Sequence, residues 1–233
     1  MVYLDSFIRG GTASIYKGRL PQTVAAHRKL SDGNYVLVLA KAAEPLNDRA
    51  HLESYKLALD MISAADSYKA EIVCGDAYGE RVKTFADTLQ SLCDGTVSSS
   101  GKTSAQADIA LCLFNIHTKK LFYYFNCGAT AMQNGSAFLW LVDQKDDGLP
   151  SQVFFAHNNQ ITYGICNLFS DEMSVVLFNN TIGKEIMEKE DYCLRFPYES
   201  IFKLFPDQTG RCLGTKPYAD QAYVYAELCS DYE

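Results

Sequence analysis

The sequence predicts an α+β domain in which a mainly antiparallel sheet packs against helices. An unbroken apolar run at Tyr35–Ala40 is typical of a strand that is buried on both faces. Two later stretches, from Asn47 onward and at Tyr78–Cys93, carry apolar residues at helical spacing. A series of short β-prone runs separated by turn signals follows, which is typical of a meander-like antiparallel sheet.

Length and composition favour one globular domain over residues 1–233. No Pro/Gly/Ser-rich linker divides the chain, and 15 Tyr with 13 Phe are enough to fill a large core. The formal net charge of -7 provides no basic surface for nucleic acid, so we exclude nucleic-acid binding. The longest apolar runs are far shorter than the roughly 20 residues that span a bilayer, so we expect no membrane insertion.

The compartment is predicted to be the cytoplasm. The N-terminal residues carry an early Asp5 and no long apolar core, unlike a secretory signal. Eight cysteines are spread singly, without a C-x-x-C pair or zinc-site spacing, so we expect mostly buried thiols in a reducing environment. His117 is expected in a hairpin turn and His51 on a helix, and the cysteines lie mostly within apolar stretches, which argues against a catalytic cysteine.

The first elements are predicted as strands and a turn. Val2–Ile8 and Ala13–Leu20 are β-prone and flank a Gly-Gly turn, whereas residues 21–31 are ambiguous. The dipeptide Asp32-Gly33 is a strong turn signal. We therefore expect Tyr35–Ala40 to be the second arm of a hairpin.

Two helices follow, both lying on the sheet. The first begins near Asn47 or Asp48 as N-cap, and its predicted buried stripe consists of residues three or four positions apart: Leu52, Tyr55, Leu59 and Ile62. The second covers Tyr78–Cys93, with a stripe of Val82, Phe85, Ala86, Leu89 and Leu92. Residues 94–106 are small and polar, so we predict a loop there. The Ser-Gly-Lys-Thr within this loop lacks the strand, helix and full spacing of a P-loop.

The rest of the chain is predicted to be mainly strands. They are expected at Asp108–Ile116, Lys120–Cys127, Ala137–Val142, Val153–Ala156, Tyr163–Leu168, Met173–Asn179 and Gln221–Leu228. Turns are expected at residues 117–119 and 134–135, and a surface loop at 143–150. One further helix is expected within Gly183–Phe205.

Four segments, in this order, resemble one protein family. They are YVLVLAKAAEPLNDRAHLESYKLALDMI, ADIALCLFNIHTKKLFYYFNCGATAMQNG, FSDEMSVVLFNNTIGKE and YADQAYVYAEL. Together they resemble the PPM-type, Mg/Mn-dependent Ser/Thr protein phosphatases, especially the branch like stage II sporulation protein E. The resemblance implies a four-layer αββα sandwich: two stacked, mainly antiparallel sheets with helices on the outside and the site at one end.

The resemblance also implies where the family holds its metals. Carboxylates in that family hold two divalent ions about 3.5–4 Å apart, and the ions activate a water that attacks a phosphoester. The family's first Asp-Gly corresponds to Lys41 and Ala42, and its Ser-Asp-Gly aspartate corresponds to Asn180. An early acidic position falls near Thr12. Only the terminal aspartate is kept, as Asp220.

These substitutions predict a degenerate site with no catalytic residue and no bound metal. One carboxylate and one amide cannot balance two dications, and an ammonium repels them. Any metal that did bind would use Asp220 and Asn180. Because a buried charge needs a partner, we expect the Lys41 ammonium to replace a metal and to pair with Asp220 and the Asn180 oxygen.

The sequence therefore favours a pseudophosphatase that acts as a regulatory or scaffold domain. It would bind a protein partner, and a phosphoprotein is one candidate for that partner. The partner would dock on the surface around the vestigial site. One alternative is an active, divergent phosphatase using Mn2+ or Mg2+, with carboxylates from other positions: Asp5, Asp32, Glu44, Asp48, Asp171 or Glu172. A second alternative is a phosphopeptide or small-anion sensor in which Lys41 retains affinity for phosphate.

Overall fold

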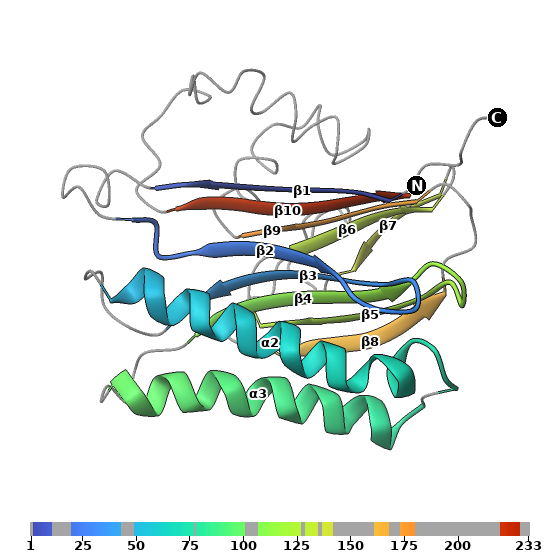
Figure 1. Cartoon of the computed structure of the whole chain (residues 1–233), viewed down its shortest axis with the longest axis horizontal. Helices are drawn as coiled ribbons and strands as arrows, with labels where there is room; N and C mark the ends of the chain where they lie inside the picture. The colour runs from blue at the N-terminus through green and yellow to red at the C-terminus, as the bar shows by residue number, and fades with distance from the viewer. Residues whose placement is uncertain are drawn as a thin grey trace, which may run out of the picture.

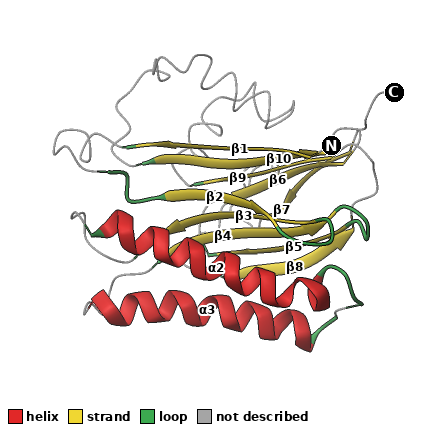
Figure 2. Ribbon diagram, in the orientation of Figure 1, coloured by secondary structure: helices red, strands yellow, loops and turns green. Residues whose placement is uncertain are grey.

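The computed structural model describes residues 2–10, 20–42, 49–76, 78–100, 107–126, 129–134, 137–141, 161–167, 173–179 and 220–228. In this part of the chain, two five-stranded antiparallel sheets are stacked, and two helices cover the outer face of one of them. Figure 1 shows the three layers, with β1 and β10 at the top of the view and α3 at the bottom. Figure 2 shows the same layers by secondary structure.

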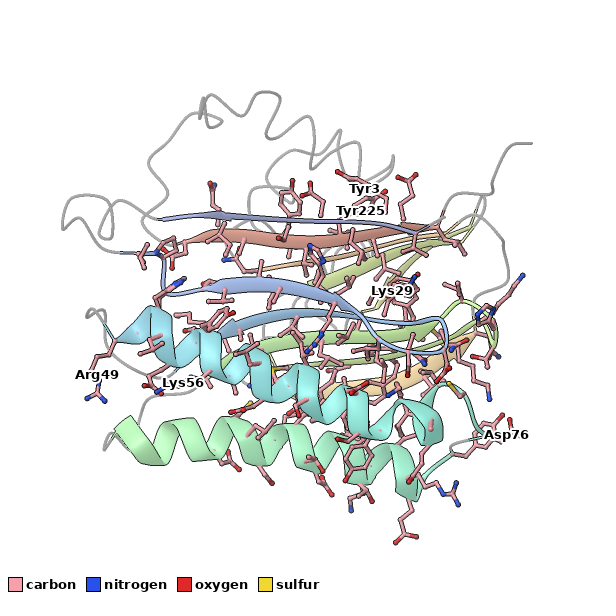
Figure 3. The ribbon with its side chains drawn as sticks, in the orientation of Figure 1. Tyr3, Lys29, Arg49, Lys56, Asp76 and Tyr225 are labelled. Carbon is pink, nitrogen blue, oxygen red and sulfur yellow. The ribbon has the colours of Figure 1, made fainter. Side chains whose placement is uncertain are left out.

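The first sheet, sheet A, joins the two ends of the chain. Its order is β1-β10-β9-β6-β7, and every neighbouring pair is antiparallel. The strands are β1 (Val2–Arg9), β10 (Gln221–Leu228), β9 (Met173–Phe178), β6 (Ala129–Asn134) and β7 (Ala137–Leu141). On its outer face the rings of Tyr3 and Tyr225 lie 6.3 Å apart (Figure 3).

The second sheet, sheet B, has the order β2-β3-β4-β5-β8 and is also antiparallel. The strands are β2 (Val24–Lys29), β3 (Asn34–Lys41), β4 (Asp108–Asn115), β5 (Lys120–Phe125) and β8 (Thr162–Asn167). Along β3, Leu37 and Leu39 pack in the core between the sheets, whereas Val36 and Val38 pack under the helices. The predicted burial of this strand on both faces is confirmed.

Helices α2 (Ala50–Ile72) and α3 (Glu80–Ser100) pack against sheet B and against each other. The Phe85 ring of α3 lies between two other rings, with centroids 5.0 Å from Tyr68 of α2 and 4.7 Å from Phe122 of β5. This aromatic contact joins both helices to the sheet. None of the described helices is long and apolar enough to cross a membrane.

The tight turn between β2 and β3 is confirmed. Asp32 and Gly33 are the central residues of a turn closed by the Asn34 N–H on the Ser31 carbonyl, and both have positive φ, 58° and 71°, as a type I′ turn requires. A Cβ at Gly33 would also lie 2.5 Å from the ring of the exposed His117 side chain, which would have to move aside. The strands predicted at residues 108–116, 120–127, 163–168, 173–179 and 221–228 are present, within one or two residues at their ends.

The structure corrects several sequence predictions. The buried face of α2 is formed by Leu57, Ala58, Met61 and their neighbours, whereas three members of the predicted stripe are exposed: Leu52, Tyr55 and Leu59. Helix α3 continues to Ser100 through residues predicted as loop. Strand β6 was not predicted, and the ambiguous residues 21–31 contain β2. For α2, the position of the helix on sheet B decides which side is buried, and apolar spacing alone does not.

Other predictions lie outside the described residues. These are the strands at Ala13–Leu20 and Val153–Ala156, the helix within Gly183–Phe205 and the loop at 143–150. The N-cap predicted at Asn47 or Asp48 is wrong, because α2 begins at Ala50 with Arg49 as its N-cap. The described residues form three of the four predicted layers: sheet A, sheet B and one helical layer.

Candidate functional site

Lys41 lies where sheet B ends beside the start of α2. It is the last residue of β3, and in the antiparallel register it stands opposite Asp108, the first residue of β4. The Lys41 Nζ and Asp108 Oδ2 atoms are 3.1 Å apart, and the two side chains are 41% and 37% exposed. Since solvent screens such a pair, it contributes only about 0–1 kcal/mol.

The predicted pairing of Lys41 with Asp220 is therefore wrong, whereas the predicted contact with the Asn180 oxygen falls outside the described residues. The register of two adjacent strands brings Asp108 to Lys41, whereas Asp220 precedes β10 in the other sheet. Sequence reasoning missed Asp108 as a site residue, although it was predicted to begin the strand that follows the helices. Pairing the end of the Lys41 strand with the start of the Asp108 strand would have identified Asp108.

The Asp220 carboxylate binds the backbone of another segment. Its Oδ2 accepts hydrogen bonds from the backbone N–H groups of Gln22, at 2.5 Å, and of Thr23, at 3.0 Å. The Asn179 side-chain amide donates to the Asp220 carbonyl at 2.5 Å. A carboxylate that accepts backbone N–H groups makes strong, charge-assisted hydrogen bonds. Asp220 thus links the start of β10 in sheet A to the segment that enters β2 in sheet B.

Ala42 connects the strand end to α2. Its N–H donates to the Ser54 hydroxyl at 2.9 Å, and its carbonyl accepts from the Gln22 side-chain amide at 3.1 Å. The Ser54 hydroxyl in turn donates to the Ala50 carbonyl at 2.8 Å. Ser54 and Gln22 are both buried, so these contacts satisfy polar groups that water does not reach.

Ser54, Gln22 and Asn126 were not among the predicted site residues. The buried Asn126 accepts from the Ile109 N–H at 2.8 Å and donates to the Ala107 carbonyl at 2.9 Å. Only Asn126 carries a signal in the sequence, as a polar residue at the end of an apolar run, and that signal does not reveal which backbone groups it binds. Asn180, the remaining predicted site residue, lies outside the described residues.

The described residues at this end do not fit a two-metal centre. Among the residues that the structure describes, no group of three or more His, Cys, Asp or Glu could hold a metal ion. Asp108 faces an ammonium, and one oxygen of Asp220 already accepts two N–H groups. Two hard dications need several carboxylate oxygens free for coordination.

The alternative carboxylates do not complete the site within the described residues. Asp32 lies in the turn at the opposite end of β3 from Lys41. Asp5 lies within β1 opposite Tyr225, and its Oδ1 accepts the Ser6 N–H at 2.8 Å. The other four fall outside the described residues: Glu44, Asp48, Asp171 and Glu172.

The described cysteines do not form a nucleophilic site. Burial raises the pKa of the Cys93 thiol to about 12 and that of the Cys166 thiol to about 11, so both stay protonated near neutral pH. Cys112 is buried as predicted, but Cys74 is exposed, where its sulfur lies 3.4 Å from the Asn115 amide nitrogen. The other four cysteines lie outside the described residues.

Comparison with solved structures supports the fold. The phosphatase domain of the cell fate determinant SpoIIE from Bacillus subtilis matches with a TM-score of 0.60 at 10% identity, covering 100% of this chain and 96% of that one. The Mycobacterium tuberculosis serine/threonine phosphatase PstP matches with a TM-score of 0.60 at 9% identity, covering 98% and 99%. RsbX in complex with magnesium matches with a TM-score of 0.57 at 8% identity, covering 98% and 96%.

No protein-family model and no curated protein sequence matches the chain. The structural similarities confirm the predicted resemblance at the level of the fold: this chain has the two-sheet architecture of PPM-type phosphatase domains, including that of SpoIIE. Because the identities are near 10%, they do not carry over metal binding or catalysis.

Proposed function

We propose that this chain is a catalytically inactive PPM-type domain that regulates or scaffolds other proteins by binding a protein partner. The observation that supports it most is the chemistry of the strand end. The sequence resemblance assigns Lys41 to the position of the family's first metal-binding aspartate, and its ammonium pairs with Asp108. An ammonium and a compensated carboxylate at that position disfavour a dication.

The internal hydrogen bonds support the same proposal. Asp220, the only family carboxylate that the sequence keeps, binds two backbone N–H groups that connect the two sheets. The side chains of Ser54 and Gln22 similarly form hydrogen bonds with the Ala42 backbone. A structural network of this kind stabilises the fold without metal. We expect no cofactor, and we place the protein in the cytoplasm, where single cysteines stay reduced.

Asp108 favours a second candidate, an active but divergent metal-dependent Ser/Thr phosphatase. Its half-exposed carboxylate lies at the same strand end, where it could join Asp220 and acidic residues outside the described part to bind Mn2+ or Mg2+. The half-exposed Lys41 ammonium is compatible with a third candidate, a sensor of phosphopeptides or small anions.

Manganese calorimetry combined with a p-nitrophenyl phosphate assay tests the proposal, with Asp220→Ala as the matched variant. We expect no tight manganese binding and no turnover. We also expect D220A to lower the free energy of unfolding by about 1–3 kcal/mol, because two N–H groups lose their acceptor. Urea denaturation measures this change, and added manganese should not alter it.

The other candidates give different results. Tight manganese binding and turnover that D220A abolishes would show an active phosphatase. Binding of a phosphoserine peptide without turnover, lost in Lys41→Ala, would favour the anion sensor.

A further inference from the structure

Helix α2 has a second apolar face that does not contact the sheet. Leu52, Tyr55 and Leu59 are 51%, 48% and 44% exposed. Their spacing of three and four residues places them on one side of the helix, and we call these three residues the outer stripe. The opposite side of α2, which includes Leu57, Met61 and Ala65, already packs in the core under the helices.

The outer stripe is not required for packing the described fold. Helix α3 covers the same sheet, and none of its exposed positions up to residue 95 carries an apolar side chain; they include Lys83, Thr84, Asp87, Ser91 and Asp94. Single exposed apolar residues are common, but a continuous stripe of Leu and Tyr is typical of a binding surface. Tyrosine is also enriched among the residues that dominate binding energy in protein interfaces.

Two exposed carboxylates of α2, Asp60 and Glu71, make no ion pair with a described residue, and Asp60 is the one that adjoins the outer stripe. Glu53 pairs with Lys56 at 2.9 Å, and Asp66 pairs with Lys69 at 2.5 Å. Asp60 is exposed next to Leu59 and makes no ion pair with any described residue. A partner that covers the outer stripe would therefore be attracted by a Lys or Arg placed opposite Asp60.

The size and charge of this surface argue against a second copy of the chain as its partner. A stable interface between folded proteins buries about 800 Å² on each side, and three half-exposed side chains supply only a fraction of that area. Two copies would each carry a net charge of -7 and an uncompensated Asp60. A single helix can instead cover such a stripe with its apolar face.

We propose that the outer stripe binds an amphipathic helix of a different protein. The apolar face of that helix packs on Leu52, Tyr55 and Leu59, and a Lys or Arg on its flank lies opposite Asp60. This surface is separate from the Lys41 strand end, since it faces away from sheet B. The inference therefore holds whether or not the strand end binds metal, and the phosphatase assay does not test it.

Site-specific photocrosslinking tests the docking surface. Tyr55 of the full chain is replaced by p-benzoylphenylalanine in the native cell, and the same substitution at Thr84 on α3 is the control. We expect Tyr55 to crosslink to a segment of another protein that has apolar residues at helical spacing and a flanking Lys or Arg. Mass spectrometry of the crosslinked peptide identifies that segment.

A synthetic peptide of the crosslinked segment then measures the contribution of each group by fluorescence anisotropy. We expect the double variant L52S/L59S to weaken binding by about tenfold or more, because it removes two apolar contacts. D60K should weaken peptide binding by about 3–10-fold and should reduce the salt dependence of the affinity. Asp87→Lys on α3 should leave affinity unchanged, and circular dichroism should show that every variant is folded.

Several results would overturn the proposal. These are crosslinks to a second copy of this chain, crosslinking at Thr84 equal to that at Tyr55, no crosslinked protein at Tyr55, or a crosslinked segment without apolar helical spacing or without basic residues. Equal peptide affinities for the wild type and L52S/L59S would also overturn it.

Discussion

Helices α2 and α3 cover the same sheet, yet they differ on the sides that face away from it. Their inner sides are alike: Met61 of α2 and Phe85 of α3 are both fully buried. Their outer sides differ, because α2 exposes Leu52, Tyr55 and Leu59 whereas α3 exposes polar residues. The fold requires only the inner sides to be apolar, so the apolar outer side of α2 needs another explanation.

The helices also differ in how they begin. The first turns of α2 contain Ser54, whose hydroxyl accepts the Ala42 N–H at the strand end that carries Lys41. Arg49 precedes this helix and projects away from the sheets (Figure 3). Helix α3 starts after the exposed Gly79, whose carbonyl accepts the Lys83 N–H. At its start, therefore, α2 is tied directly to the strand end that carries Lys41, through the Ser54 hydroxyl.

The largest predicted effect tests whether the inner sides are equivalent. Phe85→Ala should destabilise the protein by about 3–5 kcal/mol and Met61→Ala by about 2–5 kcal/mol, because each leaves a cavity in the same core. Chemical denaturation monitored by circular dichroism measures both changes. A loss below about 1 kcal/mol at either position would show that this helix does not share the core.

A smaller effect tests the difference at the helix starts. The Ser54 and Thr84 hydroxyls both donate to the carbonyl four residues earlier, at 2.8 and 2.9 Å, but only Ser54 also accepts the Ala42 N–H. Ser54→Ala should cost about 1–3 kcal/mol because a buried N–H loses its acceptor. Thr84→Ala, the matched control on α3, should stay within about 0.5 kcal/mol. Equal effects would contradict the special connection of α2.

The smallest predicted effect concerns the polar contact between the helices. The Tyr68 Oη and Thr88 Oγ1 atoms are 3.3 Å apart. Tyr68→Phe and Thr88→Val should each cost about 0.5–1 kcal/mol, and a double-mutant cycle should show that their effects are not additive. Fully additive effects would mean that this hydrogen bond does not contribute to helix pairing.

The strands illustrate how far sequence patterns can lead. The apolar run at Tyr35–Ala40 and the Asp32-Gly33 turn predicted β3 and its hairpin correctly. Burial on both faces requires consecutive apolar residues, and positive φ favours Asp and Gly, so both features can be recognised in the local sequence. The end of α3 was predicted incorrectly, since small polar residues at 94–100 carry little helical preference of their own. Strand β6 had no clear periodic signal and was missed.

The buried face of α2 could not be chosen from periodicity. The sequence has apolar residues on two sides of this helix, one through Leu52 and Leu59 and the other through Leu57 and Met61. Both stripes have helical spacing, so the pattern identifies a helix without identifying the side that meets the sheet. Only the position of α2 on sheet B decides between them.

The same division holds for the candidate site. The sequence by itself determined that a lysine, not a carboxylate, ends a buried strand and that an aspartate precedes the last strand, since these are matters of residue identity and local pattern. Tertiary structure alone decided that Lys41 pairs with Asp108 and that Asp220 binds the Gln22 and Thr23 backbone. The physical reason is the separation of these residues along the chain. Strand register and sheet stacking bring distant residues together, and local sequence does not encode those pairings.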